Sequence, residues 1–253
     1  MFSFYHILWL ILCALFITIS MVMLKKYRPS LKQVLTVACI VSVCSELIKT
    51  MSMIQIVPSG DGTMFFPYLE LQHLPLHLCS IQILMIFYCR FAKESSTKEA
   101  ILAFMYPTCI AGAFLALMMP SIFNATIEVT QCFTHPIAYQ YFLFHSMLII
   151  LGLWIPFSGD TEIRPKHYLS SLGILFGMGF LSLYLNSIFA SPTYANGELV
   201  SVNYTPNLFF TYETPIGLDL TELWQWYLYF GIIIALVILL MTLFYLPFFK
   251  RKK

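Results

Sequence analysis

Residues 223–249 read LWQWYLYFGIIIALVILLMTLFYLPFF, a stretch without a single charged side chain. Its central part, Ile232–Leu240, is apolar at even and odd positions alike. A strand of a membrane β-barrel alternates apolar and polar residues over about ten positions, so this pattern excludes a barrel strand. The stretch is long enough to cross the roughly 30 Å hydrocarbon core of a bilayer as a helix. We therefore predict a transmembrane helix here.

Six further apolar runs precede this one, separated by polar or proline-containing breaks. The composition agrees, because 59% of the 253 residues are apolar and only 10% are charged, which excludes a soluble globular protein. The expected fold is all-α, a single domain over residues 1–253 built as a membrane bundle of seven transmembrane helices. We expect the first run to be retained rather than cleaved as a signal peptide, since no basic region precedes it. The predicted helices cover residues 4–24, 31–57, 73–91, 99–119, 139–157, 169–189 and 223–249.

The basic residues occupy alternate connections between the predicted helices. Thirteen of the 14 Lys and Arg residues lie in or at the edges of the first, third and fifth connections and in the tail, and the remaining one, Lys49, lies well within the second predicted helix. Lys and Arg concentrate on the cytoplasmic side of membrane proteins. We therefore predict a multi-pass protein of the cell membrane, with its N-terminus outside and its C-terminus in the cytoplasm.

A few polar side chains lie inside these predicted helices. A charged residue at the centre of a membrane helix costs about 2.5–3.5 kcal/mol on insertion scales, so each is a candidate functional residue. Glu46 lies near the middle of the second helix, while Cys79, His145 and Asn186 fall in the outer third of three others. Simpler alternatives exist for each: Glu46 and Lys49 form an internal ion pair, His145 hydrogen-bonds a neighbouring helix, Cys79 is a packing residue, and Asn186 satisfies backbone groups.

Helical spacing separates the polar residues of the predicted third helix into two faces. Pro75, Cys79 and Gln82 share one face, whereas His73 and His77 share another. If Cys79 is a nucleophile, its base is expected from another helix, and His145 is the obvious residue. The alternative is a metal site begun by His73 and His77 and completed by Glu70 or Asp219.

The last outer connection, residues 190–222, is too long for a turn and too apolar to float free in water. We predict that Leu208–Tyr212 folds back as a lid. Aromatic residues at the start of the final helix are expected to form an interfacial belt; these are Trp224, Trp226, Tyr227 and Tyr229.

Three segments resemble a known family. Residues 72–80 read QHLPLHLCS, residues 142–146 read FLFHS, and residues 207–210 read NLFF with Pro215 downstream. Together with the order of seven helices, they resemble the bacterial YwaF-type integral membrane proteins, although that family has an aromatic residue where Leu208 follows Asn207. The chain is also distantly similar to a eukaryotic multi-spanning protein regarded as a thiol-dependent acyltransferase of ether phospholipids. That similarity implies Cys79 as the acyl acceptor, His145 as its base, and Asn186 or Asn207 as oxyanion donors.

From these observations we expect the protein to be a thiol-dependent lipid acyltransferase or acyl hydrolase that acts from the outer leaflet. Cys79 and His145 would be catalytic, and the expected substrate-binding residues are His77, Gln82, Asn186, Asn207 and Glu46. The expected partner is membrane lipid, with no nucleic acid, no cofactor and no metal. One alternative is a transporter or receptor-like binder of a small amphipathic ligand, in which Glu46, His77, His145 and Asn186 line a polar cavity. Another is a structural subunit whose polar residues only join helices.

Overall fold

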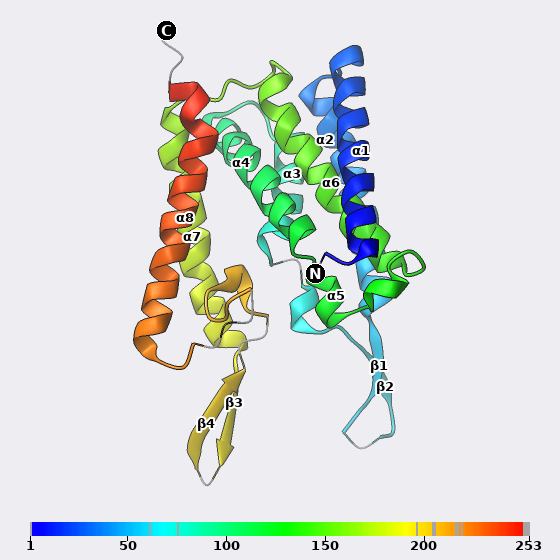
Figure 1. Cartoon of the computed structure of the whole chain (residues 1–253), viewed down its shortest axis with the longest axis vertical. Helices are drawn as coiled ribbons and strands as arrows, with labels where there is room; N and C mark the ends of the chain where they lie inside the picture. The colour runs from blue at the N-terminus through cyan, green and yellow to red at the C-terminus, as the bar shows by residue number, and fades with distance from the viewer. Residues whose placement is uncertain are drawn as a thin grey trace. The chain divides into compact units, whose positions relative to one another are not determined.

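The computed structural model describes residues 2–60, 62–74, 76–195, 197–203, 206–215, 218 and 220–249. The chain forms two compact units, each built mainly of long helices (Figure 1). The first comprises Met1–Leu69 and Leu78–Ile163, and the second comprises Glu70–His77 and Arg164–Lys253. The prediction of a mainly helical structure is therefore confirmed, while the single domain stays a prediction.

The first unit packs around one central helix, α6 (Pro136–Phe157). Helices α1 (Phe4–Tyr27), α2 (Leu31–Met53) and α4 (Ser96–Met118) each pack against α6, and α3 (Leu78–Phe91) packs against α2 and α4. Two short helices, α5 (Ile122–Ala125) and the 3-10 helix η2 (Val129–Gln131), connect α4 to α6. Most side chains of α6 are buried, whereas α1 buries only His6, Trp9 and Cys13. This contrast fits a bundle in lipid, where outer helices expose apolar side chains.

The first backbone N–H groups of a helix have no acceptor within the helix, and polar side chains supply one at the start of several of these helices. Ser30 and Gln33 form a capping box at the start of α2, and the Ser95 hydroxyl accepts a hydrogen bond from Lys98 N at the start of α4. Pro136 occupies the first turn of α6, where its missing N–H costs no hydrogen bond. These residues set the helix boundaries that the apolar runs alone leave open.

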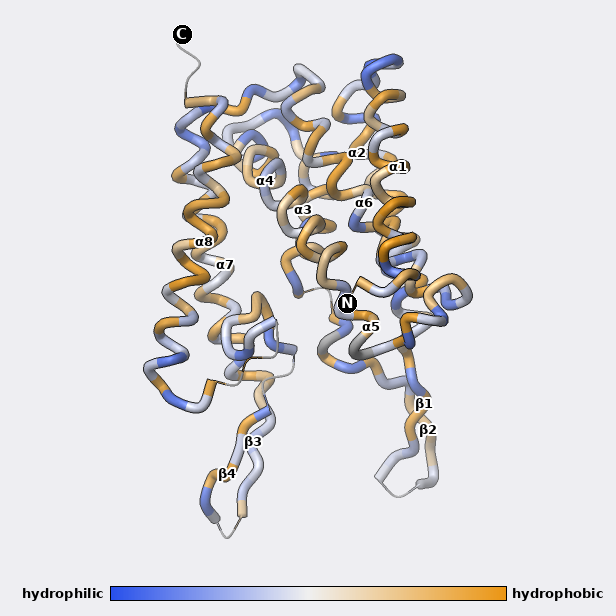
Figure 2. The backbone as a smooth tube through the Cα atoms, in the orientation of Figure 1, coloured by the Kyte–Doolittle hydropathy of each residue, from blue (hydrophilic) through white to orange (hydrophobic). Residues whose placement is uncertain are grey.

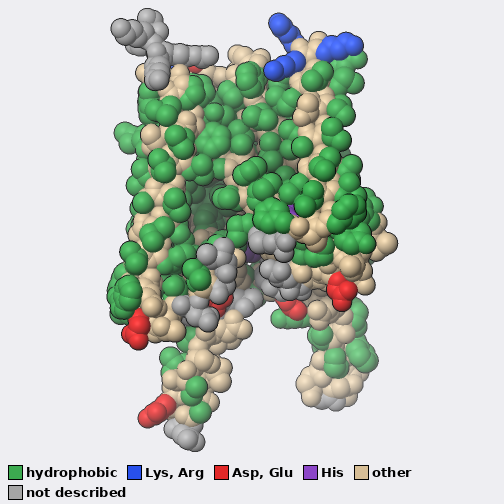
Figure 3. All heavy atoms as spheres, viewed as in Figure 1, with side chains coloured by type: hydrophobic (Ala, Val, Ile, Leu, Met, Phe, Trp, Pro, Cys, Tyr) green, Lys and Arg blue, Asp and Glu red, His purple; other side chains and the backbone are tan. Residues whose placement is uncertain are grey.

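Six helices in the described part of the chain are long and apolar enough to cross a membrane. Hydrophobic colour runs along these helices, and hydrophilic residues gather near their ends (Figure 2). Apolar side chains cover the visible face of the first unit, and its basic side chains gather at the end where α1 finishes (Figure 3). A multi-pass membrane protein is thus supported, while the seventh crossing and the orientation stay predictions.

The seventh apolar helix, α3, is shorter than predicted. It contains 14 residues, about 21 Å at 1.5 Å per residue, which is less than the hydrocarbon thickness. The predicted start at His73 is wrong: the 3-10 helix η1 (Leu71–His73) ends there, Leu74 is extended with ψ 147°, and α3 begins at Leu78. A residue before proline is pushed out of the α region, and Leu74 precedes Pro75, which lies outside the described residues. The predicted pairing of His73 and His77 on one helical face is therefore wrong as well.

Two β-hairpins correct the expectation of an all-α fold. Strands β1 (Gln55–Pro58) and β2 (Phe65–Tyr68) pair antiparallel in the first unit, where the predicted second helix was to continue to Val57. β-Branched and aromatic residues such as Ile56, Val57 and Phe66 favour strands, and their apolarity made them look like an extension of the helix. In the second unit, β3 (Ser191–Ala195) pairs with β4 (Glu198–Asn203).

The second unit is an antiparallel helix pair with a docked loop. Helix α7 (Lys166–Phe189) packs against α8 (Leu223–Phe249). Hydroxyl pairs join the two helices, Ser171 Oγ to the Tyr245 hydroxyl at 2.8 Å and the Tyr168 hydroxyl to Thr242 Oγ1 at 2.9 Å. Such interhelical hydrogen bonds stabilise helix pairs in lipid, where apolar contact alone gives little preference for a partner.

The 3-10 helix η3 (Leu208–Phe210) folds back onto α7 through the side chain of Asn186. The Asn186 amide donates to Leu208 O at 3.0 Å and to Thr211 Oγ1 at 2.8 Å, while its oxygen accepts from Leu208 N at 2.7 Å. From α8, Trp226 Nε1 donates to Thr211 O at 2.9 Å. The predicted fold-back is confirmed, and action as a lid stays a prediction.

The predicted aromatic belt divides into two kinds of residue. Trp226 and Tyr229 hold the docked loop, since the Tyr229 hydroxyl donates to Phe210 O at 2.6 Å. Trp224 and Tyr227 are both 62% exposed. An interfacial position for this second pair stays a prediction.

Gly152 in α6 lies where no larger residue fits. A Cβ atom at this position would lie 2.7 Å from Ile110 Cγ1 and 3.0 Å from Tyr106 O, both in α4. We expect Gly152→Ala to lower stability by about 1–3 kcal/mol, because the closely packed helices must separate. The melting temperature of the detergent-solubilised protein measures this change.

Gly173→Ala in α7 is the matched control, since nothing lies within 4 Å of a Cβ at that position. It should leave the melting temperature unchanged or raise it slightly, because alanine favours helix more than glycine does. Equal melting temperatures for Gly152→Ala and the control would contradict the packing account.

Replacing Asn186 should release the docked loop. Asn186→Leu removes three hydrogen bonds and leaves Leu208 N and Leu208 O without these partners. We expect faster amide hydrogen exchange over residues 206–215 while α7 stays protected. Tyr184→Leu, at a position of the same helix that is 66% exposed, serves as control and should not alter exchange. Unchanged exchange in Asn186→Leu would rule out this tethering role.

Candidate functional site

Cys79 lies in the first turn of α3, beside a glycine of α4. A Cβ atom at Gly112 would lie 3.7 Å from Cys79 Sγ, so the glycine leaves space next to the thiol. The thiol-bearing residue is half-buried. Backbone N–H groups in the first turn of a helix lack intrahelical acceptors and favour a nearby thiolate. A nucleophilic role for Cys79 stays a prediction.

His145 is held in one orientation inside the first unit. The residue is 7% exposed, and its Nδ1 lies 2.7 Å from the carbonyl oxygen of Tyr141, one turn earlier in α6. A carbonyl accepts hydrogen bonds, so Nδ1 carries the proton and Nε2 carries the lone pair. Among the described residues, Nε2 has no hydrogen-bond partner. The imidazole is therefore available to accept a proton at Nε2.

Tyr141 packs against His145 on the same helix. Its ring centroid lies 4.3 Å from that of His145. The Tyr141 hydroxyl donates to Ala116 O at 2.9 Å. Our sequence analysis missed Tyr141, although a tyrosine four positions before His145 lies on the same helical face and was a usable signal.

No hydrogen bond joins Cys79 directly to His145 in the described residues. The predicted nucleophile and base thus do not form a preformed pair. Catalytic hydrogen bonds often tighten only when substrate is bound. Catalysis by this pair stays a prediction.

Gln82 joins α3 to α4 one turn beyond Cys79. Its amide nitrogen donates to Thr108 Oγ1 at 3.0 Å, and its oxygen accepts from Cys109 Sγ at 3.3 Å. The Thr108 hydroxyl in turn donates to Phe104 O at 2.7 Å. Burying an amide is tolerated when it is hydrogen-bonded, and here it aligns the helix that carries Cys79. Substrate binding by Gln82 stays a prediction, and its α4 partners were not anticipated.

Glu46 in α2 forms an ion pair with Lys49, at 2.8 Å between Oε2 and Nζ. The ion pair that the i, i+3 spacing of Glu46 and Lys49 allows is therefore present. The adjacent Ser45 Oγ accepts a hydrogen bond from Gln140 Nε2 of α6 at 2.6 Å. The side chains of Lys49 and Glu46 remain 15% and 27% exposed, respectively. A binding role for Glu46 stays a prediction.

The remaining predicted residues, His77, Asn186 and Asn207, belong to the second unit. His77 is half-buried and lies just before α3 rather than within it. Asn186 uses its amide to hold η3. Asn207 adopts the left-handed conformation with φ 44°, and its oxygen accepts from Tyr212 N at 3.2 Å. Both asparagines thus organise the loop, and their predicted roles as oxyanion donors stay predictions.

The alternative metal site gains no support from the described residues. Within those ranges, no three His, Cys, Asp or Glu side chains gather in a group that could hold a metal ion. Asp219, which the alternative required, lies outside the described residues.

Comparison with known proteins identifies the family. No curated protein and no solved structure matches the chain. The TMEM164 family matches over residues 1–245, which is nearly the whole chain and includes Cys79, His145 and the helices that carry them. This chain therefore belongs to the TMEM164 family of membrane proteins.

Proposed function

We propose that this protein is a thiol-dependent lipid acyltransferase or acyl hydrolase of the cell membrane, with Cys79 as nucleophile and His145 as base. The main support is the orientation of His145. The carbonyl oxygen of Tyr141 accepts a hydrogen bond from Nδ1–H, which leaves Nε2 as the proton acceptor. Helix α6, which carries His145, packs against α4, and α4 packs against α3, which carries Cys79. A general base needs this combination of fixed ring and available lone pair. The distant resemblance to a thiol-dependent acyltransferase, noted in the sequence, implies the same two residues.

The reaction would begin with proton transfer from Cys79 Sγ to His145 Nε2. The thiolate attacks the carbonyl carbon of an acyl ester, and the resulting tetrahedral oxyanion collapses by breaking the carbon–oxygen bond of the ester. The leaving alcohol takes the proton from His145, and the acyl group remains as a thioester on Cys79. Water or a second lipid alcohol then attacks the thioester, which yields a free acid or a new ester and restores the thiol.

The tetrahedral oxyanion requires hydrogen-bond donors close to Cys79. Gln82 already donates to Thr108, and Asn186 and Asn207 already bond the loop that follows α7. The first-turn N–H groups of α3 are a further source, because they lack acceptors within the helix. We therefore propose these backbone groups, which lie in the same unit as His145, as the oxyanion donors.

Loss of Cys79 should abolish acyl transfer to the protein. We expect Cys79→Ala to show no hydroxylamine-sensitive label after incubation with a phospholipid that carries an alkyne-tagged acyl chain. His145→Ala should reduce labelling by about 10²–10⁴-fold, the usual contribution of general-base catalysis. Labelling is measured on protein in nanodiscs, after confirming that each variant keeps its melting temperature.

Cys44→Ala is the matched control, because Cys44 is an exposed cysteine of α2 that no step uses. It should label like the original protein. Undiminished labelling and lipid turnover in Cys79→Ala, or in His145→Ala, would refute the mechanism.

A second candidate is a transporter or receptor-like binder of a small amphipathic ligand, favoured by the Glu46–Lys49 ion pair inside α2. Charged residues within a membrane helix are rare and commonly line ligand or ion paths. In this case, binding or flux of a labelled amphipathic ligand should survive Cys79→Ser and fall with Glu46→Gln, which leaves Lys49 unpaired. Loss of activity in Cys79→Ser with retention in Glu46→Gln would exclude the binder and favour the enzyme.

A further inference from the structure

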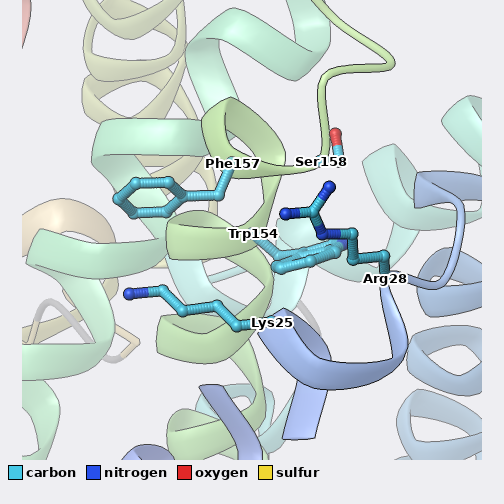
Figure 4. Close-up of a pocket in the computed structure, with 5 residues that line it drawn as sticks. All are labelled: Lys25, Arg28, Trp154, Phe157 and Ser158. Carbon is cyan, nitrogen blue, oxygen red and sulfur yellow. The ribbon is translucent and has the colours of Figure 1, made fainter. Parts of the chain in front are cut away.

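A cavity of about 390 Å³ lies in the first unit, where α1 and α6 end. Such a volume falls within the range of about 300–1,000 Å³ that is usual for small-molecule sites. Basic and aromatic side chains line it together with one hydroxyl (Figure 4): Lys25, Arg28, Trp154, Phe157 and Ser158. None of these residues takes part in the chemistry proposed for Cys79.

The two cations of this cavity have no carboxylate partner. Within the described residues, neither Lys25 nor Arg28 forms an ion pair. The Lys25 ammonium lies over the Phe157 ring, 5.4 Å from its centroid. Asp160, the acidic residue that follows α6, accepts a hydrogen bond from Leu31 N instead. Two uncompensated positive charges at one cavity favour an anionic ligand.

Trp154 adds a buried donor to the same cavity. The residue is 3% exposed, and its Nε1–H has no hydrogen-bond partner among the described residues. A buried polar group without a partner is uncommon, because it loses hydration without compensation. In Figure 4, the Arg28 side chain lies next to the Trp154 ring. A ligand bearing acceptor oxygens would satisfy this N–H together with the cations once the adjoining Arg28 side chain shifts toward the ligand.

Arg28 reaches the cavity from a strained backbone position. It caps α1 in the left-handed conformation, with φ 46° and ψ 53°. Glycine is the usual residue there, because a side chain is disfavoured at positive φ. Strain of this kind tends to be kept where it positions a functional group, and here it carries a guanidinium to the cavity.

We propose that this cavity binds the phosphate group of an anionic ligand, with the headgroup of an acidic phospholipid as the expected source. Arg28 can bind phosphate oxygens in a bidentate manner, while Lys25 and Trp154 Nε1 supply further donors. The cavity lies at the helix ends that the charge distribution predicts to be cytoplasmic, where acidic phospholipids attract basic residues. The aromatic rings of Trp154 and Phe157 provide apolar surface for the glycerol and upper acyl chain.

The test is native mass spectrometry of the detergent-solubilised full chain, titrated with phosphatidylglycerol and with phosphatidylcholine as the zwitterionic reference. We expect phosphatidylglycerol to bind more tightly. The double variant Lys25→Gln/Arg28→Gln should bind it at least about tenfold more weakly, since each basic residue near a lipid surface contributes about 1 kcal/mol. Trp154→Phe keeps an aromatic ring but removes the N–H donor, and should weaken binding to a smaller extent.

The matched control is Lys26→Gln/Lys32→Gln, which removes the same charge from two exposed positions that do not line the cavity. It should retain the preference for phosphatidylglycerol. Competition with inorganic phosphate distinguishes a lipid headgroup from a soluble phosphate compound as the ligand. Failure of phosphate to displace the lipid supports the headgroup, whereas displacement at equal concentration supports a site for soluble phosphate compounds and overturns the lipid assignment.

Equal binding of phosphatidylglycerol and phosphatidylcholine would overturn the proposal, provided that inorganic phosphate also fails to bind. So would an equal loss of binding in Lys26→Gln/Lys32→Gln, since bulk charge would then explain the effect. Melting temperatures of all variants establish that they fold. Because both cations are exposed, their replacement should leave the fold intact.

Discussion

The absence of water from the hydrocarbon core is the constraint on which this structure depends. Every backbone N–H and C=O group in that layer needs a partner within the protein, and a helix supplies one without help from other segments. The long apolar runs therefore become helices whether or not they are packed against one another. Helix α1 illustrates the result, since it buries only three residues along its 24-residue length. Irregular and β structure is confined to the connections, as in the hairpins β1–β2 and β3–β4.

Helix association must then come from close packing and polar contacts, because lipid tails are as apolar as leucine. Gly152 allows α6 to approach α4 closely, and Gly112 leaves space on α4 beside Cys79. Polar pairs join further helices: the buried pair of Gln82 with Thr108 joins α3 to α4, and the part-buried pair of Ser45 with Gln140 joins α2 to α6. The polar residues that looked like a shared site in the sequence thus include several whose hydrogen bonds are structural. Cys79 and His145 stand apart, since the thiol lies in a first turn and the imidazole keeps Nε2 available.

The two proposed sites use different chemistry at different places in the first unit. Cys79 is half-buried and His145 is buried, and the acyl transfer proposed for them would benefit from the exclusion of bulk water. The cavity at the ends of α1 and α6 presents Lys25 and Arg28 to anions. Membership of the TMEM164 family covers both regions, because the match extends over residues 1–245.

The amino-acid sequence by itself determined the class of structure and most helix positions, because apolar length and helix capping act over a few neighbouring residues. It misplaced the start of α3, because His73 and His77 were assigned to a helix that begins only at Leu78, and it hid β1 inside the predicted second helix. Tertiary structure decided which polar groups meet. Asn186 binds Leu208 across 22 residues, Gln82 binds Thr108 across 26, and Lys25 and Arg28 meet the end of α6 far along the chain. Such contacts depend on how the helices rotate and pack against one another. Side-chain volumes and hydrogen bonds throughout each unit determine this packing together, so no local sequence pattern predicts it.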